Sequence, residues 1–197
     1  RIDPEHGEVF GENPCHRFYL GQGQPTGFSG WFIIQVKRQP SSYGIYSGSE
    51  IREHVTFIQN EKKSGAYLSL PVKAGEQIVV KVASSFVSVD GARHNMETEC
   101  PGWNFDRVRS QLAKQWERHL SVVEVTGGNK DALTKFYTSL YRTAFCPHAF
   151  SDADGRSPSF AGGKTIEKTS GTYFTDYSLW DTFRALHPLI TLFYPHV

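Results

Sequence analysis

A chain of 197 residues, 39% of them hydrophobic, is long enough to bury a core, which excludes extensive disorder. Its 21 Lys and Arg residues balance 20 Asp and Glu residues, for a formal net charge of +1. That balance excludes a global field that would attract nucleic acid or an anionic membrane. We expect no nucleic-acid partner, and a neutral polar ligand fits better.

Two further features limit the class of protein. Cys15, Cys100 and Cys146 cannot all pair with one another, and their spacing matches no zinc site, so we expect mostly unpaired thiols. No apolar run is long enough to span a bilayer, so no membrane span is predicted.

The first part of the chain is predicted to form antiparallel β-structure. From Gly27 to Val89, β-branched and aromatic runs at 31–36 and 77–82 alternate with Gly, Ser and Asn clusters. Several short strands in so short a stretch indicate a β-sandwich or barrel.

A hairpin is predicted within this β-region. Its turn is expected at 61–65, between strands at 54–59 and 66–70. Pro71 is expected to end the second strand, because proline cannot donate to a strand ladder.

Helices are predicted after Pro101. Asn104 is the expected cap of the first, and Asn129 that of the second, which Pro147 terminates. Both carry apolar residues at three- and four-residue steps. The stripe of the first helix consists of Phe105, Val108, Leu112, Trp116 and Leu120, and that of the second of Leu133, Phe136, Tyr137, Leu140, Tyr141 and Ala144.

A third helix is predicted to begin near Ser178, after a polar, Gly-rich loop over 151–172. Pro188 is expected to kink or shorten it. Strands followed by helices, without βαβ alternation, indicate two segregated domains.

The first polar cluster is Ser151–Arg156. Asp152 and Asp154, beside Gly155 and Arg156, are suited to binding a cation, orienting sugar hydroxyls, or forming an Asx-turn with an ion pair. Spacing alone favours the turn. The segment lacks the remaining acidic positions of an EF-hand loop, so calcium binding of that kind is not expected.

The second cluster runs from Asp176 to Arg184. Ser178 and Asp181 have the spacing of a capping box, in which the Asp side chain only satisfies a backbone donor. Alternatively, Trp180 and Asp181 form a sugar-binding pair, the ring for stacking and the carboxylate for hydroxyl contacts. His148 and His187 lie beside the two clusters.

Five segments, in order along the chain, resemble glycoside hydrolase family 92. They are SFVSVDGAR at 85–93, GWNFD at 102–106, FYTSLY at 136–141, SDADGR at 151–156 and SLWDTFRALHPL at 178–189. The resemblance runs from about residue 80 to the end, whereas the preceding residues fit the N-terminal sandwich of the family only in general character.

The resemblance implies an exo-acting, calcium-dependent α-mannosidase that removes terminal mannose, often α-1,2-linked, with inversion. It also implies an antiparallel β-sandwich joined by a linker helix to an (α/α)6 barrel. We therefore expect an N-terminal β-sandwich over 1–100, incomplete at its start, a linker over 101–126, and a truncated beginning of the catalytic barrel over 127–197.

The resemblance further implies that the catalytic acid and base and the calcium ligands lie beyond Val197, so no catalytic residue or metal ligand is assigned within the chain. Substrate-binding roles are expected for Trp180 and Asp181, with Asp154 and Arg156 as weaker pocket-lining candidates. The fragment alone is expected to be inactive and poorly soluble.

The implied partners are mannose-containing glycans, and the implied location is secreted, periplasmic or on the cell surface. Two alternatives remain. In the first alternative, the chain is a non-catalytic carbohydrate-binding or structural module. In the second, it is part of another (α/α)6 hydrolase or phosphorylase with a similar sandwich.

Overall fold

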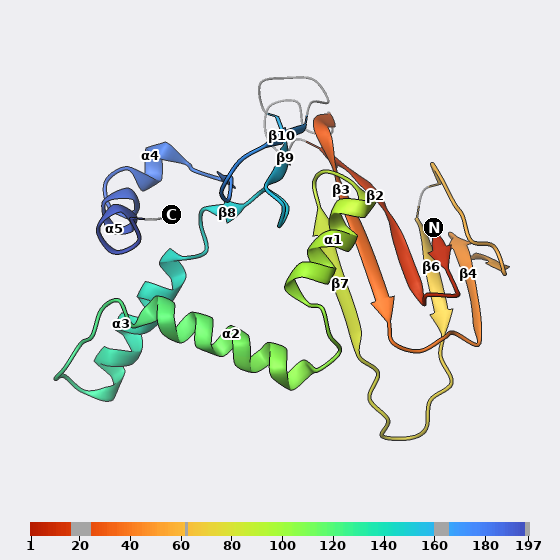
Figure 1. The fold of residues 1–197 in the computed structure, drawn as a ribbon, viewed down its shortest axis with the longest axis horizontal. Helices are drawn as coiled ribbons and strands as arrows, with labels where there is room; N and C mark the ends of the chain where they lie inside the picture. Colours follow the sequence, from red (N-terminus) through yellow and green to blue (C-terminus); the bar gives the residue numbers. More distant parts are fainter. Residues whose placement is uncertain (17–24, 62, 160–165, 196–197) are drawn as a thin grey trace. The chain divides into compact units, whose positions relative to one another are not determined.

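The computed structural model describes residues 1–16, 25–61, 63–159 and 166–195. These residues group into two compact units (Figure 1). The first comprises Arg1–Trp103 and Ser151–Thr172, and the second comprises Asn104–Phe150 and Tyr173–Val197. The chain therefore leaves the first unit and returns to it before ending in the second.

The larger sheet of the first unit has the strand order β1-β2-β3-β7, and every neighbouring pair is antiparallel. Its strands are β1 (Ile2–Asp3), β2 (Glu8–His16), β3 (Pro25–Val36) and β7 (Val80–Ser85). β7 begins three residues later than the apolar run at 77–82 predicted.

Helix α1 (Val89–Glu99) packs on β3 and β7 and completes the core of this unit. Ile33 of β3 and Ala92 and Met96 of α1 form the buried cluster. The sequence analysis predicted no helix here, because α1 is short, polar and contains a glycine. Its one local signal is Ser88, whose hydroxyl accepts a hydrogen bond from the Gly91 N–H at 2.9 Å, as an N-cap does.

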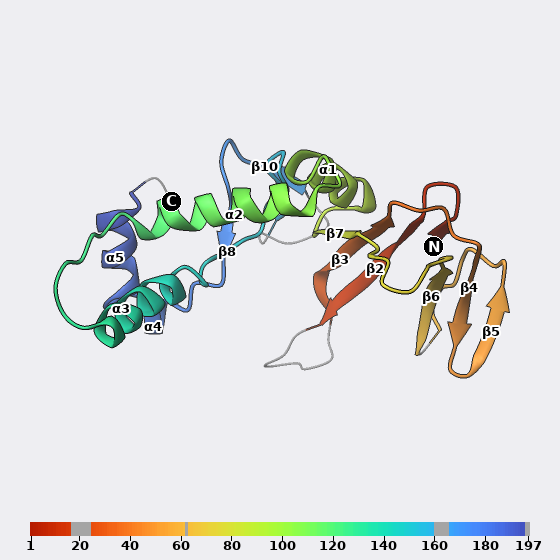
Figure 2. The same ribbon diagram turned by 90° about the horizontal axis from the view of Figure 1, so that it is seen from below.

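A second sheet in this unit has the order β5-β4-β6, again antiparallel, and Figure 2 shows the three strands side by side. They span Ser42–Ser47 (β4), Glu50–Glu53 (β5) and Ser64–Ser69 (β6). The hairpin turn between β4 and β5 contains Gly48, at φ +58°, in the left-handed region that glycine tolerates.

The predicted hairpin around 61–65 is wrong. Residues 54–59 form no strand, and β6 pairs with β4 instead. The backbone turns at His54 and Asn60, whose φ angles are +60° and +58°, so the apolar run between them cannot continue β5 as an extended strand.

The returning segment adds a small antiparallel pair to the first unit. β9 (Arg156–Pro158) pairs with β10 (Ile166–Lys168), within the stretch that the sequence analysis treated as a loop. Residues 160–165 of that stretch lie outside the described residues.

The second unit is helical. It contains α2 (Phe105–Leu120), α3 (Lys130–Thr143), α4 (Leu179–Thr182) and α5 (Leu186–Phe193). Both predicted caps are confirmed, since the side chains of Asn104 and Asn129 each accept a hydrogen bond from a first-turn N–H at 2.9 Å. A short pair, β8 (His148–Ala149) with β11 (Phe174–Thr175), joins the segments around the returning stretch.

The third predicted helix is divided into α4 and α5, as Pro188 suggested. Pro188 lies in the first turn of α5, where its missing N–H needs no intrahelical partner. Its ring would clash with the Arg184 carbonyl in a continuous helix, which explains the interruption between Thr182 and Leu186.

Antiparallel sheets followed by helices confirm the predicted fold class; the described helices form no closed barrel. The predicted domain boundaries stay a prediction. Cys15, Cys100 and Cys146 all lie in described parts of the chain and form no disulfide with one another. Among the described helices, none combines the length and the apolar character needed to cross a membrane.

Candidate functional site

Asp152 belongs to the returning segment of the first unit and is buried, with a fractional exposure of 6%. One carboxylate oxygen, Oδ2, accepts a hydrogen bond from the Ser85 hydroxyl at 2.7 Å. The other, Oδ1, accepts one from the Asn95 amide at 2.9 Å. Both partners come from the β7–α1 region, so Asp152 fastens the returning segment to the first unit.

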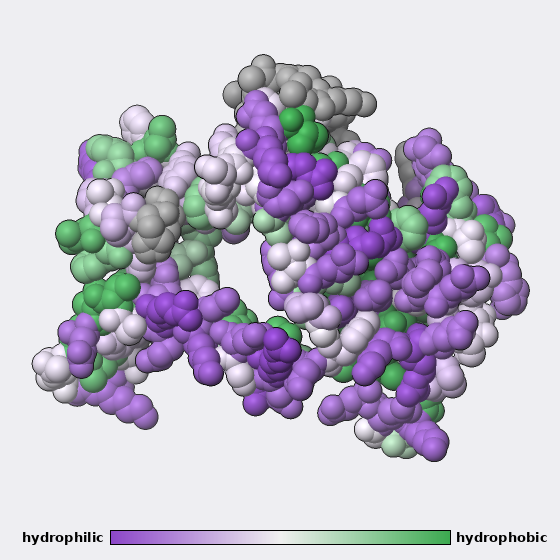
Figure 3. Space-filling view, in the orientation of Figure 1, coloured by the Kyte–Doolittle hydropathy of each residue, from purple (hydrophilic) through white to green (hydrophobic). Residues whose placement is uncertain are grey.

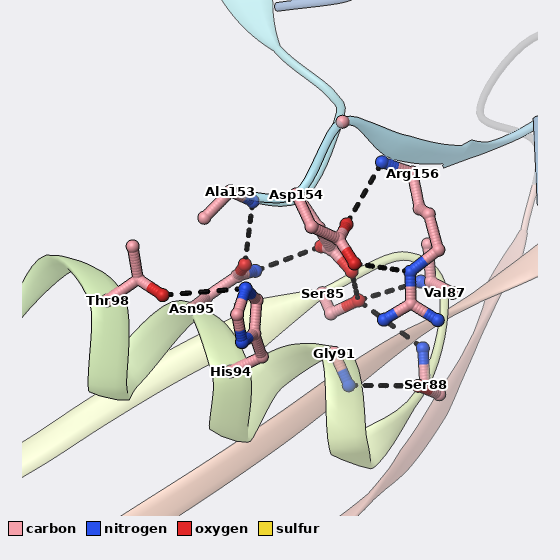
Figure 4. Close-up of polar contacts among 12 residues, drawn as sticks. Ser85, Val87, Ser88, Gly91, His94, Asn95, Thr98, Ala153, Asp154 and Arg156 are labelled. Carbon is pink, nitrogen blue, oxygen red and sulfur yellow. Dashed lines mark hydrogen bonds and ion pairs between the residues drawn. The ribbon is translucent and has the colours of Figure 1, made fainter. Parts of the chain in front are cut away.

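The side chains of Ser85 and Asn95 make further hydrogen bonds, besides those to Asp152 (Figure 4). The Ser85 oxygen accepts from the Val87 N–H at 2.8 Å, while the Asn95 amide also donates to the Ser84 carbonyl at 2.9 Å. The Asn95 oxygen accepts from the Ala153 N–H at 2.8 Å. A buried polar network whose members are all satisfied rigidifies its surroundings.

Gly91 makes this approach possible. A Cβ at Gly91 would lie 2.4 Å from Asp152 Oδ2 and 2.7 Å from the Ser85 oxygen, well inside van der Waals contact. The glycine in α1 therefore serves the packing of the returning segment.

Asp154 forms an Asx-turn with an ion pair, which was the interpretation that spacing favoured. Its carboxylate accepts from the Arg156 N–H at 3.1 Å and from the Arg156 Nε at 2.6 Å. Gly155, at φ +83°, makes the turn. Desolvation acts to raise the pKa of Asp154, but the hydrogen bonds from the Arg156 backbone and guanidinium outweigh it and lower that pKa.

Trp180 and Asp181 lie at the start of α4 in the second unit. Trp180 is 88% exposed, and Asp181 is exposed as well. The predicted capping box does not form, because the Ser178 hydroxyl donates to the Asp181 carboxylate at 2.7 Å instead of accepting from a backbone N–H. Asp181 is thus held by a side chain while its carboxylate stays open to solvent.

A third polar pair, which the sequence analysis did not identify, also lies in the second unit. The Nδ1 of His148 lies 2.7 Å from Oδ2 of Asp176. The pairing of β8 with β11, in which His148 faces Thr175, brings these distant residues together. Sequence spacing gives no signal for a contact that depends on strand pairing across 28 residues.

A cavity of about 150 Å³ in the second unit has a different character. His119 and Tyr194 line it, with rings stacked at 4.2 Å, and the Tyr194 hydroxyl donates to the His119 carbonyl at 3.0 Å. Burial lowers the pKa of His119 and raises that of Tyr194. The remaining lining is mostly apolar, so the cavity does not suit a sugar: it consists of Thr143, Ala144, Cys146, Pro147, Phe174 and Ile190.

The structure thus joins Asp154 with Arg156 in the first unit and places Trp180 beside Asp181 in the second. Within the described ranges, no group of three or more His, Cys, Asp or Glu side chains is arranged to hold a metal ion. The described residues therefore do not fit a calcium site of their own.

The chain is similar to known glycosidases. A solved inverting mannosidase of family GH92 from Bacteroides thetaiotaomicron is 32% identical with a TM-score of 0.82, over 96% of this chain and 25% of that one. An α-mannosidase of the same family and organism is 33% identical with a TM-score of 0.69, over 83% and 23%. A protein from Arthroderma benhamiae described as an uncharacterized secreted glycosidase is 28% identical over 129 residues, which are 62% of this chain and 16% of that protein.

The chain therefore spans a quarter or less of the length of these relatives. The model of the glycosyl hydrolase family 92 catalytic domain matches residues 91–197, more than half of the chain. That match covers α2–α5, the Asp152 network from Gly91 onward, and both Asp154 and Trp180. The chain belongs to glycoside hydrolase family 92.

Proposed function

We propose that the full-length protein is an exo-α-mannosidase that removes terminal mannose, often α-1,2-linked, from glycans with inversion and with the help of calcium. The family match over residues 91–197 carries this proposal. Two solved relatives described as mannosidases, one of them as inverting, support the substrate and the stereochemical outcome.

Within this chain, we assign substrate binding to Trp180 and Asp181. An exposed indole offers an apolar face on which a sugar ring stacks, and the neighbouring carboxylate accepts hydrogen bonds from hydroxyls. Asp154 and Arg156 are weaker pocket-lining candidates, since each already spends part of its hydrogen-bonding capacity on the other.

The catalytic acid, the catalytic base and the calcium ligands are assigned to parts of the full-length protein outside these 197 residues. Inverting hydrolysis needs one carboxylic acid at the leaving oxygen and one carboxylate that activates water. Asp152 suits neither role, because it is buried and both of its oxygens accept hydrogen bonds from Ser85 and Asn95.

The organisation and location follow the same proposal. Residues 1–100 form the N-terminal β-sandwich domain, 101–126 the linker, and 127–197 the beginning of an (α/α)6 barrel. Mannose-containing glycans are the partners. A secreted, periplasmic or cell-surface location belongs to the same proposal, and the relative from Arthroderma benhamiae described as secreted supports the first of these locations.

The test is hydrolysis of an α-mannobioside by the full-length protein and by the 197-residue chain, each with and without a calcium chelator. We expect the full-length protein to release mannose and the chelator to suppress that release. We expect no release by the 197-residue chain. Proton NMR of the first-formed product should show the β-anomer of mannose, as inversion requires.

Three other results would redirect the proposal. Turnover by the 197-residue chain would place acid–base chemistry among its own carboxylates. Turnover that requires phosphate would indicate a phosphorylase. Mannose binding without turnover in the full-length protein would indicate a carbohydrate-binding module.

A further inference from the structure

We propose that His148 and Asp176 form a second sugar-hydroxyl binding pair beside Trp180 and Asp181, an inference that rests on the proposed glycosidase function. The pair hydrogen-bonds at 2.7 Å and joins two segments of the second unit through the β8–β11 pairing. Its side chains stay largely in solvent, with exposed fractions of 63% and 55%.

The hydrogen bond to Asp176 determines which nitrogen of the His148 ring is available to a ligand. Because Nδ1 faces a carboxylate, Nδ1 carries the proton, and in the neutral ring Nε2 is then an acceptor. Neither this Nε2 nor Oδ1 of Asp176 has a hydrogen-bond partner among the residues that the structure describes. Two open acceptors fit a ligand that presents several hydroxyl donors, as a hexose does.

Stability alone is a poor explanation for the pair. Exposed ion pairs contribute about 0–1 kcal/mol. Asp176 meanwhile has φ +69°, in the left-handed region that is unfavourable for a residue other than glycine, although Asp and Asn tolerate it better than most. A residue held in this conformation, with half of its carboxylate unused, is the pattern expected of a binding group.

Two aromatic residues follow Asp176 closely in the chain. Tyr177, next to Asp176, stacks on His187 with centroids 5.1 Å apart and planes inclined by 24°. Trp180 follows Asp176 by four residues, so their Cα atoms lie within about 14 Å of each other. An exposed indole four residues from Asp176 adds the apolar face that sugar sites combine with hydrogen-bonding side chains.

The chain contains a matched pair without these features. His6 and Asp3 have the same Nδ1–Oδ2 geometry at 2.8 Å and are also exposed, at 69% and 37%. They are only three residues apart, and Asp3 Oδ1 already accepts from the N–H groups of Glu5 and His6. The His6–Asp3 pair is therefore explained by the turn that it stabilises, and it serves as a control.

The experiment uses the full-length protein, with kcat and KM measured on an aryl α-mannoside. The two test variants are His148→Phe, which keeps a ring but removes both nitrogens, and Asp176→Asn, which keeps a residue tolerant of the left-handed conformation. We expect KM to rise about three- to tenfold, the effect of one lost hydrogen bond, with kcat within about twofold. His148→Gln, which restores an acceptor oxygen, should recover part of the affinity.

His6→Phe is the control and should leave both constants unchanged. Unchanged KM in His148→Phe and Asp176→Asn, with an active parent protein, would overturn this inference and leave the proposed function standing. An equal fall of kcat in His6→Phe and His148→Phe would show a general effect of removing a surface histidine, and would also overturn it.

A failure of the proposed function is distinguishable from a failure of this inference. If the unsubstituted full-length protein hydrolyses no mannoside, binding of methyl α-mannoside by calorimetry takes the place of KM. A loss of affinity in His148→Phe but not in His6→Phe would then support the pair in a binding protein. Equal affinities, or no binding by the parent, would overturn it.

Discussion

Gly91 lets α1 lie against the carboxylate of Asp152 and the hydroxyl of Ser85. In the middle of a helix, alanine is ordinarily more stable than glycine by up to about 1 kcal/mol. Here the added methyl group would meet oxygen atoms at 2.4 and 2.7 Å, so either α1 or the returning segment has to move. Whether Gly91→Ala raises or lowers the free energy of unfolding therefore shows whether α1 lies in tight contact with Asp152 and Ser85.

We expect Gly91→Ala to lower the free energy of unfolding by about 1–3 kcal/mol, the usual cost of overpacking a tight contact. Urea-induced unfolding of the chain measures it. Gly102→Ala is the matched control, because a Cβ there has no atom within 4 Å and its effect should stay within about 0.5 kcal/mol. A Gly91→Ala protein as stable as the parent would contradict the tight packing of Asp152.

At this scale the sequence anticipated local contacts and missed distant ones. The Asx-turn of Asp154 with Arg156 depends on residues two apart, so spacing alone favoured it. The burial of Asp152 depends on Ser85 and Asn95, which are 67 and 57 residues away, and no local pattern predicts it. The cluster therefore contains one buried carboxylate that anchors the segment and one half-buried carboxylate paired with Arg156, and the local sequence does not distinguish them.

At the scale of helices and strands, capping and periodicity predicted α2 and α3 because both signals are local. The same signals failed for α1, whose glycine and polar residues weaken the helical pattern. They also produced a strand at 54–59, where an apolar run is bounded by two left-handed residues. Strand pairing, as between β4 and β6, depends on partners that periodicity does not specify.

The packing of α2 against the residues that follow α5 should depend on pH. His119 of α2 stacks on Tyr194, and burial lowers the pKa of His119 below its ordinary value near 6.5. The unfolded chain therefore binds this proton more readily than the folded chain, so stability falls as pH drops below about 6.5. Asp154, whose pKa is lowered from 3.8, loses its contribution only in a more acidic range.

We expect the urea midpoint of the chain to decrease between pH 7.5 and pH 5.5, and His119→Gln to make that decrease smaller. Tyr194→Phe keeps the stacked ring and should retain the pH dependence of the parent. If His119→Gln and the parent chain lose equal stability over this interval, another group is responsible.

At the scale of the whole chain, the helical unit exposes much apolar surface. α2 has no buried residue, and the first part of its predicted stripe, Phe105, Val108 and Leu112, is exposed, as are Phe183 and Leu192. Figure 3 shows hydrophobic side chains, in green, at the surface of this unit. Contiguous exposed apolar patches promote association.

We expect the 197-residue chain to self-associate, with a sedimentation coefficient that rises with concentration. Replacing Phe105 and Leu112 together by Glu should reduce association, because two apolar side chains of one stripe become charged. Gln111→Glu adds a charge on the same helix without removing apolar surface and should have little effect. A single monomeric boundary at all concentrations of the parent chain would contradict the prediction.

The return of Ser151–Thr172 to the first unit has a consequence during synthesis. The sheet and α1 emerge from the ribosome first, but Asp152 follows only after the whole of Asn104–Phe150 has been translated. At about 5–20 residues per second, that interval is roughly two to ten seconds. During this interval, Ser85 and Asn95 hydrogen-bond to water in place of the Asp152 carboxylate. The contact that holds the returning segment to the first unit therefore forms only after α2 and α3 have been synthesised.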